Sequence, residues 1–493
     1  YIQIPFMKKI FTIILLFAIA AKLFSQEAPH NFTLLSNVTN AQMNATAGSS
    51  LWAYTSNGSE YALMGTDAGV SIVDITDPVN PIVLFNVPHA NSEWREIKTF
   101  SHYAYASNET GQGILIIDLA NLPVSETHQS WTDNGYFNTC HTLWVDENGI
   151  LYLFGTDVGN GGALMYDLNV SATAPPRIGA YNGEYIHDGF VRGDTLWASN
   201  IYQGHLSVID VSNPNAPNVI AQWNTPDNFT HNSWPTYDNH YTFTTDEVSD
   251  SKLTSYDVSD LQNVTELDEA QSNPGSNVII HNVHLLNDSV AFVSYYRDGI
   301  RVFSVKDPNN IIEIGSYDTS PLSGDNFNGC WGVYPYLPSG VTIASDIEGG
   351  LFVVQPTLVQ PAYLVGVVTD SLTNAPLNNT IITIQTTSNS DISDLSGNYS
   401  TGNRDSGLYT IHCMKAGYTT KDYHVFLHNG VTTVLNVKLE ALVPFTLQGV
   451  VLDSSTNQPI QNAQLFFTDN SQYTYSSVTD ASGSFSVPNF FNG

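Results

Sequence analysis

Four histidines recur at one position of an internal repeat, and their side chains are the ones in this sequence best suited to chemistry. In a chain with only 14 histidines, four fall at equivalent positions: His141, His187, His231 and His281. Imidazole binds metal ions, transfers protons and forms hydrogen bonds near neutral pH. Arg95 and Trp331 take the same position in the flanking units. We therefore predict that these six residues, called the axial ring below, form one ligand-binding site.

The repeat that positions these residues has a period of 44 to 50 residues. Seven units, aligned on the histidine position, begin at Ser49, Arg95, His141, His187, His231, His281 and Trp331. Each unit holds an inner strand, a second strand such as 195–199 and a third such as 205–211, and most add a fourth. Such a period with three or four strands per unit is typical of a β-propeller. We predict an all-β fold with a seven-bladed β-propeller over residues 27–356.

The seventh unit lacks a fourth strand, because its third strand at 350–354 runs directly into the next domain. Residues 31–38 (NFTLLSNV) form a strand candidate that belongs to no unit. A three-stranded blade would leave an open sheet edge. We predict that residues 31–38 complete the seventh blade and close the ring.

A second set of polar residues is expected at the same end of the propeller. The loop into each inner strand and the loop between the second and third strands open on one face. These second loops carry Asp67, Glu109, Asp157, Asp246, Glu247, Arg297 and Asp346.

Three interpretations of the axial ring are open. The histidines could hydrogen-bond the backbone of neighbouring blades, or they could bind a small polar or glycan-like molecule together with Trp331 and the acids. They could also hold a divalent metal ion, with His187, His231, Asp246 and Glu247 as ligands. Metal–nitrogen bonds are ~2.1 Å long, and inner strands of different blades lie farther apart than the ~4.8 Å of paired strands. A site between adjacent blades is therefore easier to form than one that uses four histidines.

A repeated aspartate follows the third strand of most units, and it is a turn residue in our interpretation. The residues are Asp74, Asp118, Asp167, Asp210 and Asp257, each followed closely by a small, polar or proline residue. This pattern fits an Asx turn better than a metal ligand. Asp394 and Asp480 have the same role in two matching hairpin turns. The sequence shows no HExxH, G-x-S-x-G, Walker or Rossmann motif in a suitable context.

Composition excludes one class of partner. The chain has 15 Lys+Arg against 46 Asp+Glu, a net charge of −31. Nucleic acid needs basic patches, so we expect no nucleic-acid partner. Only three cysteines are present, Cys140, Cys330 and Cys413. We predict buried free thiols and no disulfide framework.

The N-terminus is typical of an exported protein. Residues 7–25 combine a basic start, an apolar stretch and small residues, the pattern of a cleaved signal peptide. Residues 1–6 precede Met7 and are interpreted as a leader outside the native protein. We expect no transmembrane segment after cleavage, and an extracellular or outer-surface location.

Two resemblances extend this interpretation. The motifs IVDITDP (72–78) and VIDVSNP (208–214) resemble the LVIVD repeat, and residues 30–356 resemble the choice-of-anchor B family of exported bacterial proteins. That resemblance implies a repeat domain with varied C-terminal attachment modules and no established enzymatic activity. Residues 364–441, after a linker at 357–363, resemble a carboxypeptidase regulatory-like module, a β-sandwich of transthyretin or immunoglobulin type. Residues 445–493 repeat the start of that module and are interpreted as a truncated second copy.

The leading functional hypothesis is a secreted or cell-surface bacterial binding or scaffold protein. Its propeller face would bind an unknown ligand, such as a glycan or another cell-surface molecule, and the sandwich modules would act as spacers on a monomeric chain. An exported metal-dependent hydrolase or lyase using the histidines and acids is one alternative, and a divalent metal ion would be its cofactor. A purely structural adhesive protein is the other alternative.

Overall fold

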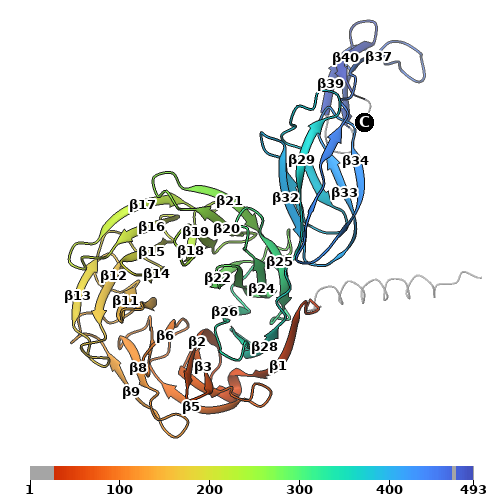
Figure 1. Cartoon of the computed structure of the whole chain (residues 1–493). Helices are drawn as coiled ribbons and strands as arrows, with labels where there is room; N and C mark the ends of the chain where they lie inside the picture. The colour runs from red at the N-terminus through yellow and green to blue at the C-terminus, as the bar shows by residue number, and fades with distance from the viewer. Residues whose placement is uncertain (1–26, 469–473, 492–493) are drawn as a thin grey trace, which may run out of the picture. The chain divides into compact units, whose positions relative to one another are not determined.

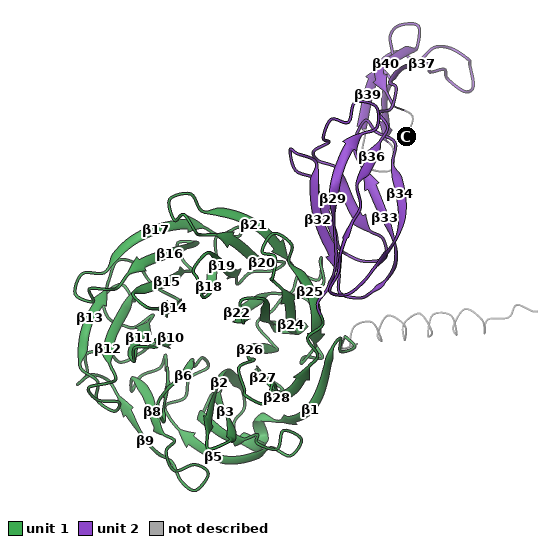
Figure 2. Ribbon diagram, in the orientation of Figure 1, with its two compact units in different colours: residues 1–359 green, residues 360–493 purple. Residues whose placement is uncertain are grey.

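The computed structural model describes residues 27–468 and 474–491 and divides the chain into two compact units, 1–359 and 360–493 (Figure 2). The expected leader and signal peptide lie outside the described residues. Every helical element in the described part is a short 3-10 turn, η1 (Asn40–Met43) or η2 (Tyr296–Asp298), and the rest of the regular structure is strand. The predicted all-β fold is confirmed. Among these same residues, no helix is long and apolar enough to span a membrane.

Unit 1 is a ring of seven four-stranded antiparallel sheets, with the first strand of each blade at the centre (Figure 1). Blade 1 is β2 (Gly48–Ser56), β3 (Ser59–Thr66), β4 (Gly69–Asp74) and β5 (Ile82–Pro88). Blade 2 is β6 (Ile97–Phe100), β7 (Tyr103–Ala106), β8 (Ile114–Asp118) and β9 (Thr127–Trp131). Blade 3 is β10 (Thr142–Val145), β11 (Ile150–Phe154), β12 (Ala163–Asp167) and β13 (Arg177–Tyr181). Blade 4 is β14 (Asp188–Arg192), β15 (Thr195–Asn200), β16 (His205–Asp210) and β17 (Asn218–Asn224).

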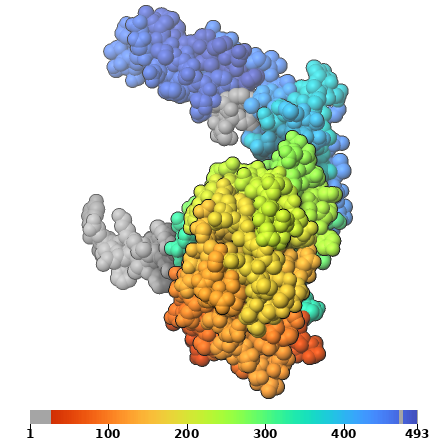
Figure 3. Space-filling model, turned by 90° about the vertical axis from the view of Figure 1, so that its left-hand side faces the viewer, coloured from red at the N-terminus to blue at the C-terminus, as the bar shows by residue number. Residues whose placement is uncertain are grey.

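The last three blades follow the same plan. In Figure 3 the colour of the propeller surface runs from orange through yellow to green, in sequence order. Blade 5 is β18 (Thr230–Pro235), β19 (Tyr241–Asp246), β20 (Leu253–Asp257) and β21 (Thr265–Ala270). Blade 6 is β22 (Ile280–Leu286), β23 (Val290–Tyr295), β24 (Gly299–Ser304) and β25 (Ile312–Tyr317). Blade 7 is β26 (Cys330–Tyr334), β27 (Thr342–Asp346), β28 (Gly350–Pro356) and β1 (Phe32–Val38).

The strand from the N-terminus closes the ring, as predicted. β1 pairs antiparallel with β28, from Phe32 opposite Pro356 to Val38 opposite Leu351. Blade 7 therefore combines one strand from the start of the propeller with three from its end, and its third strand has no open edge.

Apolar side chains between neighbouring blades form the cores of the propeller. One cluster joins Leu63 of blade 1 to Ile97 and Leu115 of blade 2, and all three are fully buried. Because the blades pack face against face, every blade depends on its neighbours for burial. The three cysteines are buried and free, as the sequence predicted.

Unit 2 is a β-sandwich followed by four further strands. One sheet has the order β32 (Asn398–Asn403), β29 (Ala362–Asp370), β35 (Thr432–Val434), with β36 (Val437–Leu439) also on β29. The other has the order β31 (Ser390–Ile392), β30 (Ile381–Ile384), β33 (Gly407–Met414), β34 (Lys421–Leu427). β29 begins inside the segment expected to be a linker, because Ala362 pairs with Asn403. The later strands are β37 (Phe445–Val450), β38 (Gln464–Thr468), β39 (Thr474–Val478) and β40 (Ser484–Phe490).

Candidate ligand and metal site at the propeller axis

The structure brings the four predicted histidines together. Successive imidazole centroids are 4.2 Å apart for His141 and His187, 4.6 Å for His187 and His231, and 4.3 Å for His231 and His281. His281 in turn lies 4.3 Å from the Trp331 ring. Neighbouring inner strands therefore place their side chains in one continuous arc, which runs from His141 through His187, His231 and His281 to Trp331.

Local backbone irregularities help to aim these side chains. The pairing register shifts between Thr230 and Asn232, around His231, and between Ile280 and Val283, around His281. A bulge of this kind bends the strand and redirects a side chain. The arc therefore depends on bulges as well as on the repeat.

Hydrogen bonds orient two of the imidazoles. The Nδ1 atom of His141 contacts the carboxylate of Glu109, and the Nδ1 atom of His281 contacts the backbone carbonyl of Trp331. A carboxylate and a carbonyl accept hydrogen bonds, so each Nδ1 carries the proton and each Nε2 presents a lone pair. The Nε2 of His141 lies 3.2 Å from the Nε2 of His187.

Nε2 of His281, on a residue that is 1% exposed, is buried without a hydrogen-bond partner among the described residues. Burial lowers the pKa of His231, but a hydrogen bond with the backbone of His281 raises it, so that imidazole has a partner in the neighbouring blade. A buried polar atom left unpaired costs about 1–3 kcal/mol. The interpretation that each histidine is satisfied by a neighbouring blade therefore holds for only part of the arc.

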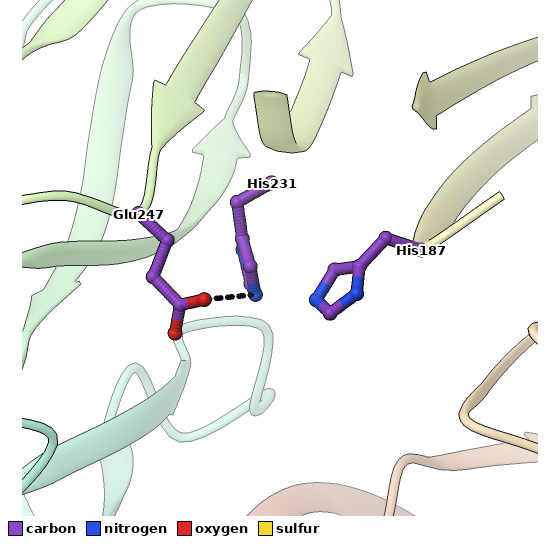
Figure 4. Close-up of side chains that lie close together, drawn as sticks. All are labelled: His187, His231 and Glu247. Atoms are coloured by element: carbon purple, nitrogen blue, oxygen red, sulfur yellow. Dashed lines mark ion pairs between the residues drawn. The ribbon is translucent and has the colours of Figure 1, made fainter. Parts of the chain in front are cut away.

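Glu247 completes the cluster, as Figure 4 shows. Ligand atoms of His187, His231 and Glu247 all lie within 4.8 Å of one another. Each carboxylate oxygen of Glu247 is 3.8 Å from an Nε2 atom, one on His231 and the other on His281. The hydroxyl of Tyr296 donates to the same carboxylate at 2.6 Å. Three of the four residues in the predicted metal site therefore converge.

Asp246, the fourth residue of that predicted site, is not part of the cluster. Its carboxylate accepts hydrogen bonds from the Thr225 hydroxyl and from the backbone N–H groups of Asp227 and Phe229. These bonds fix the loop that enters β18, so including Asp246 among the ligands was wrong.

Most of the other predicted loop residues also form hydrogen bonds away from the histidines. Asp67 accepts from the N–H groups of Thr46 and Ala47, and Asp157 from those of Asn138 and Thr139. The Asp346 carboxylate accepts hydrogen bonds from the Gly349 N–H and the Thr319 hydroxyl. Arg297 donates to the Ser323 carbonyl and to the side-chain oxygen of Asn328. Glu109 and Glu247 are the loop residues that reach the histidines.

Arg95 belongs to the axial ring, but its side chain is bonded to the surrounding backbone. Its guanidinium donates to the backbone carbonyls of Thr66, Ala90 and Ser107 and contacts Nδ1 of His89. Burial lowers the pKa of Arg95 to about 10, so the group remains charged at neutral pH. With its donors occupied, Arg95 is not free to bind an anionic ligand.

Burial controls the protonation of the cluster. It lowers the pKa of His187 and of His231 well below the ordinary value, and the neighbouring imidazoles act in the same direction. Burial also lowers the pKa of His281 to about 3 and raises the pKa of Glu247 to about 7. The three histidines are therefore neutral at pH 7, the form in which imidazole binds a metal ion.

A small cavity joins the arc to a second tier of polar residues that the sequence did not lead us to expect. The cavity is lined by His141, His231, His281, Arg95, Trp94 and Trp331. It is also lined by four residues that directly follow axial-ring residues in the sequence: Glu96, Thr142, Asp188 and Asn282. Burial raises the pKa of Asp188 to about 6. Polar residues at this position in successive units were the available signal, but strict strand alternation would have turned them away from the axis.

Aromatic side chains form a third tier. Trp144 lies 6.4 Å from Trp52 and 5.6 Å from Trp234, and Trp234 lies 4.7 Å from His284. The Lys98 ammonium sits 4.3 Å from the Trp52 ring and is paired with Glu96. The axis therefore changes from imidazoles to carboxyl and amide groups and then to indoles.

Comparisons with known proteins bear on unit 2 more than on the site. Residues 364–440 match the carboxypeptidase regulatory-like domain family. No curated protein matches the chain. Among solved structures, the chain is similar to a candidate 6-phosphogluconolactonase from Bacteroides fragilis, with 14% identity and a TM-score of 0.42 over 61% of this chain and 88% of that one. A similarity at that level supports no argument about the site.

Proposed function

We propose that this chain is an exported, cell-surface binding protein that takes its ligand at the propeller axis and uses its β-sandwich modules as spacers. The observation that supports the proposal is the buried arc of imidazoles in which Nε2 of His281 has no hydrogen-bond partner among the described residues. Perturbed, incompletely paired polar groups that share a cavity are typical of binding sites. The resemblance of residues 30–356 to the choice-of-anchor B family, with its attachment modules, fits the same function.

The size of the cavity restricts what can bind between the tiers. Its volume is ≈ 10 Å³, about that of one water-sized sphere. A sugar residue is many times larger, so a glycan could contact only the mouth of the site. An ion or a single small molecule is the better fit for the interior.

A thermal-shift screen of the full chain tests this function. The panel contains divalent metal chlorides, monosaccharides and oligosaccharides. A ligand present at 100 times its Kd stabilises the folded state by about 2.7 kcal/mol, so its effect is measurable as a rise in Tm. We expect at least one class to raise the Tm of the wild type and to have no effect on the His187→Ala/His231→Ala variant.

The matched control is His205→Ala, because His205 pairs with Glu184 outside the arc. This variant should respond to the ligand as the wild type does. If no class raises the Tm, or if the double variant responds equally, the axial site is not the binding site. Protease accessibility on intact cells tests the export of the chain.

A further inference from the structure

We propose that His187, His231 and Glu247 bind one divalent transition-metal ion on the propeller axis, and that the flanking imidazoles of His141 and His281 add to its coordination. This inference rests on the proposed function, because the ion is then the ligand of the axial site or the group that holds it. It also changes the site predicted from sequence, which used His187, His231, Asp246 and Glu247, by adding His141 and His281 and leaving out Asp246.

The separations between ligand atoms support a shared ion. Two ligand atoms that each lie ~2.1 Å from one metal ion are ~3.0–3.4 Å apart in octahedral or tetrahedral geometry. The Nε2 atoms of His141 and His187 are 3.2 Å apart. The carboxylate of Glu247 lies 3.8 Å from Nε2 of His231 and of His281. The ligand atoms of His187, His231 and Glu247 all lie within 4.8 Å of one another, whereas those of His141 and His281 fall outside that group and must move farther to reach the same ion.

The hydrogen bonds around the cluster also suit metal ligation. A metal-bound imidazole usually donates its other N–H to a carboxylate or a backbone carbonyl. His141 donates from Nδ1 to Glu109, and His281 donates from Nδ1 to the Trp331 carbonyl. The lone pair of Nε2 is therefore left for a ligand in His281, whereas Nε2 of His141 faces Nε2 of His187 at 3.2 Å. The Tyr296 hydroxyl holds Glu247 in the same way.

The unpaired nitrogen of His281 points to the same conclusion from a different observation. Nε2 of His281 has no hydrogen-bond partner within the described part of the chain, although the residue is only 1% exposed. Neutral imidazoles could pair with each other, but that accounts only for the contact between His141 and His187. A cation would satisfy several lone pairs at once.

The donor set selects the kind of metal. Calcium and magnesium prefer shells of oxygen ligands, whereas imidazole suits zinc, copper, iron and nickel. Four nitrogens and one carboxylate therefore favour a first-row transition metal.

Solvent can reach the site beside Glu109, whose side chain is 34% exposed, whereas that of His141 is 12% exposed.

Cobalt(II) titration of the full-length protein, purified without a histidine tag and stripped with a chelator, tests the inference. Visible absorption reports the coordination of the bound ion, and calorimetry gives the stoichiometry and the Kd. We expect one equivalent of cobalt, displaced by zinc. His187→Ala and His231→Ala should each weaken binding by about 100-fold or more, since loss of a direct ligand exceeds the 10–100-fold effect of removing its hydrogen-bond partner.

Two variants serve as controls. His205→Ala and His128→Ala remove histidines outside the arc and should bind cobalt as the wild type does. Tryptophan fluorescence verifies that each variant is folded, and His187→Gln repeats the test with a side chain that fills more of the space.

Two results would overturn the inference. One is a folded wild-type protein that binds no cobalt or zinc. The other is equal binding by His187→Ala and His231→Ala, which would place the ion elsewhere. If metals fail but another ligand raises the Tm only when the arc is intact, the binding function stands without the metal.

Discussion

Two polar positions recur around the propeller, and they differ in how their side chains are satisfied. At the end of the third strand, five aspartates each accept the backbone N–H two residues later, at 2.9 Å in every case, from Asp74, Asp118, Asp167, Asp210 and Asp257. At the axial position the partners differ from residue to residue, and Nε2 of His281 has no hydrogen-bond partner among the described residues. A repeated residue with one constant local partner is architectural. A repeated residue with incomplete partners is a candidate for binding.

Arg95 offers the strongest test of this distinction. It occupies the axial position, but its side chain has hydrogen-bond partners, as the turn aspartates do. Arg95→Met should lower the free energy of unfolding by about 3 kcal/mol or more, since three buried carbonyl oxygens lose a donor at about 1–3 kcal/mol each. Urea unfolding followed by tryptophan fluorescence measures this effect. All eight tryptophans lie in residues 52–331, so the signal reports the propeller alone.

The same variant should keep its cobalt stoichiometry. Loss of cobalt binding with unchanged stability would show that Arg95 belongs to the binding site, and the comparison between the two kinds of position would fail there.

Glu109→Gln sharpens the comparison on the axial side. The side chain remains able to accept a hydrogen bond from Nδ1 of His141, but it loses the negative charge that makes the imidazole a stronger ligand. We expect cobalt affinity to fall by about 10–100-fold with one equivalent still bound. Calorimetry measures the Kd, and an unchanged value would mean that Glu109 only holds a loop.

Asp210→Ala tests one of the turn aspartates, and it should have the smallest effect on stability. It removes the acceptor for the Ser212 N–H in an exposed turn. We expect the urea midpoint to fall by at most ~0.5 M with an unchanged m value, because the substitution alters one turn and no core contact. Cobalt affinity should be the same as in the wild type. A change in affinity would show that the turns influence the axis.

The blade count and the ring closure could be predicted because both depend on sequence period. Residues 31–38 belonged to no unit and blade 7 lacked a strand, so one feature explained the other. The convergence of the histidines followed from the same period, since equivalent positions on inner strands face one axis.

The choice between adjacent residues could not be predicted in the same way. Asp246 and Glu247 are neighbours, yet Asp246 turns back to the loop before β18 and Glu247 reaches the histidines. One residue of register reverses the direction of a side chain at the end of a strand. The commitment of Arg95 to carbonyl groups and the second tier that includes Asp188 depend on loop paths and bulges, which have no strong sequence signal.

The pairing of β1 with β28 has a consequence for how the propeller forms. Phe32 and Pro356 are 324 residues apart in sequence (356 − 32). The chain entropy lost in joining such distant segments exceeds that of a ten-residue hairpin by about 3 kcal/mol. Contacts of this separation slow folding. We therefore expect blade 7 to assemble last, and its assembly to convert seven neighbouring sheets into one cooperative unit.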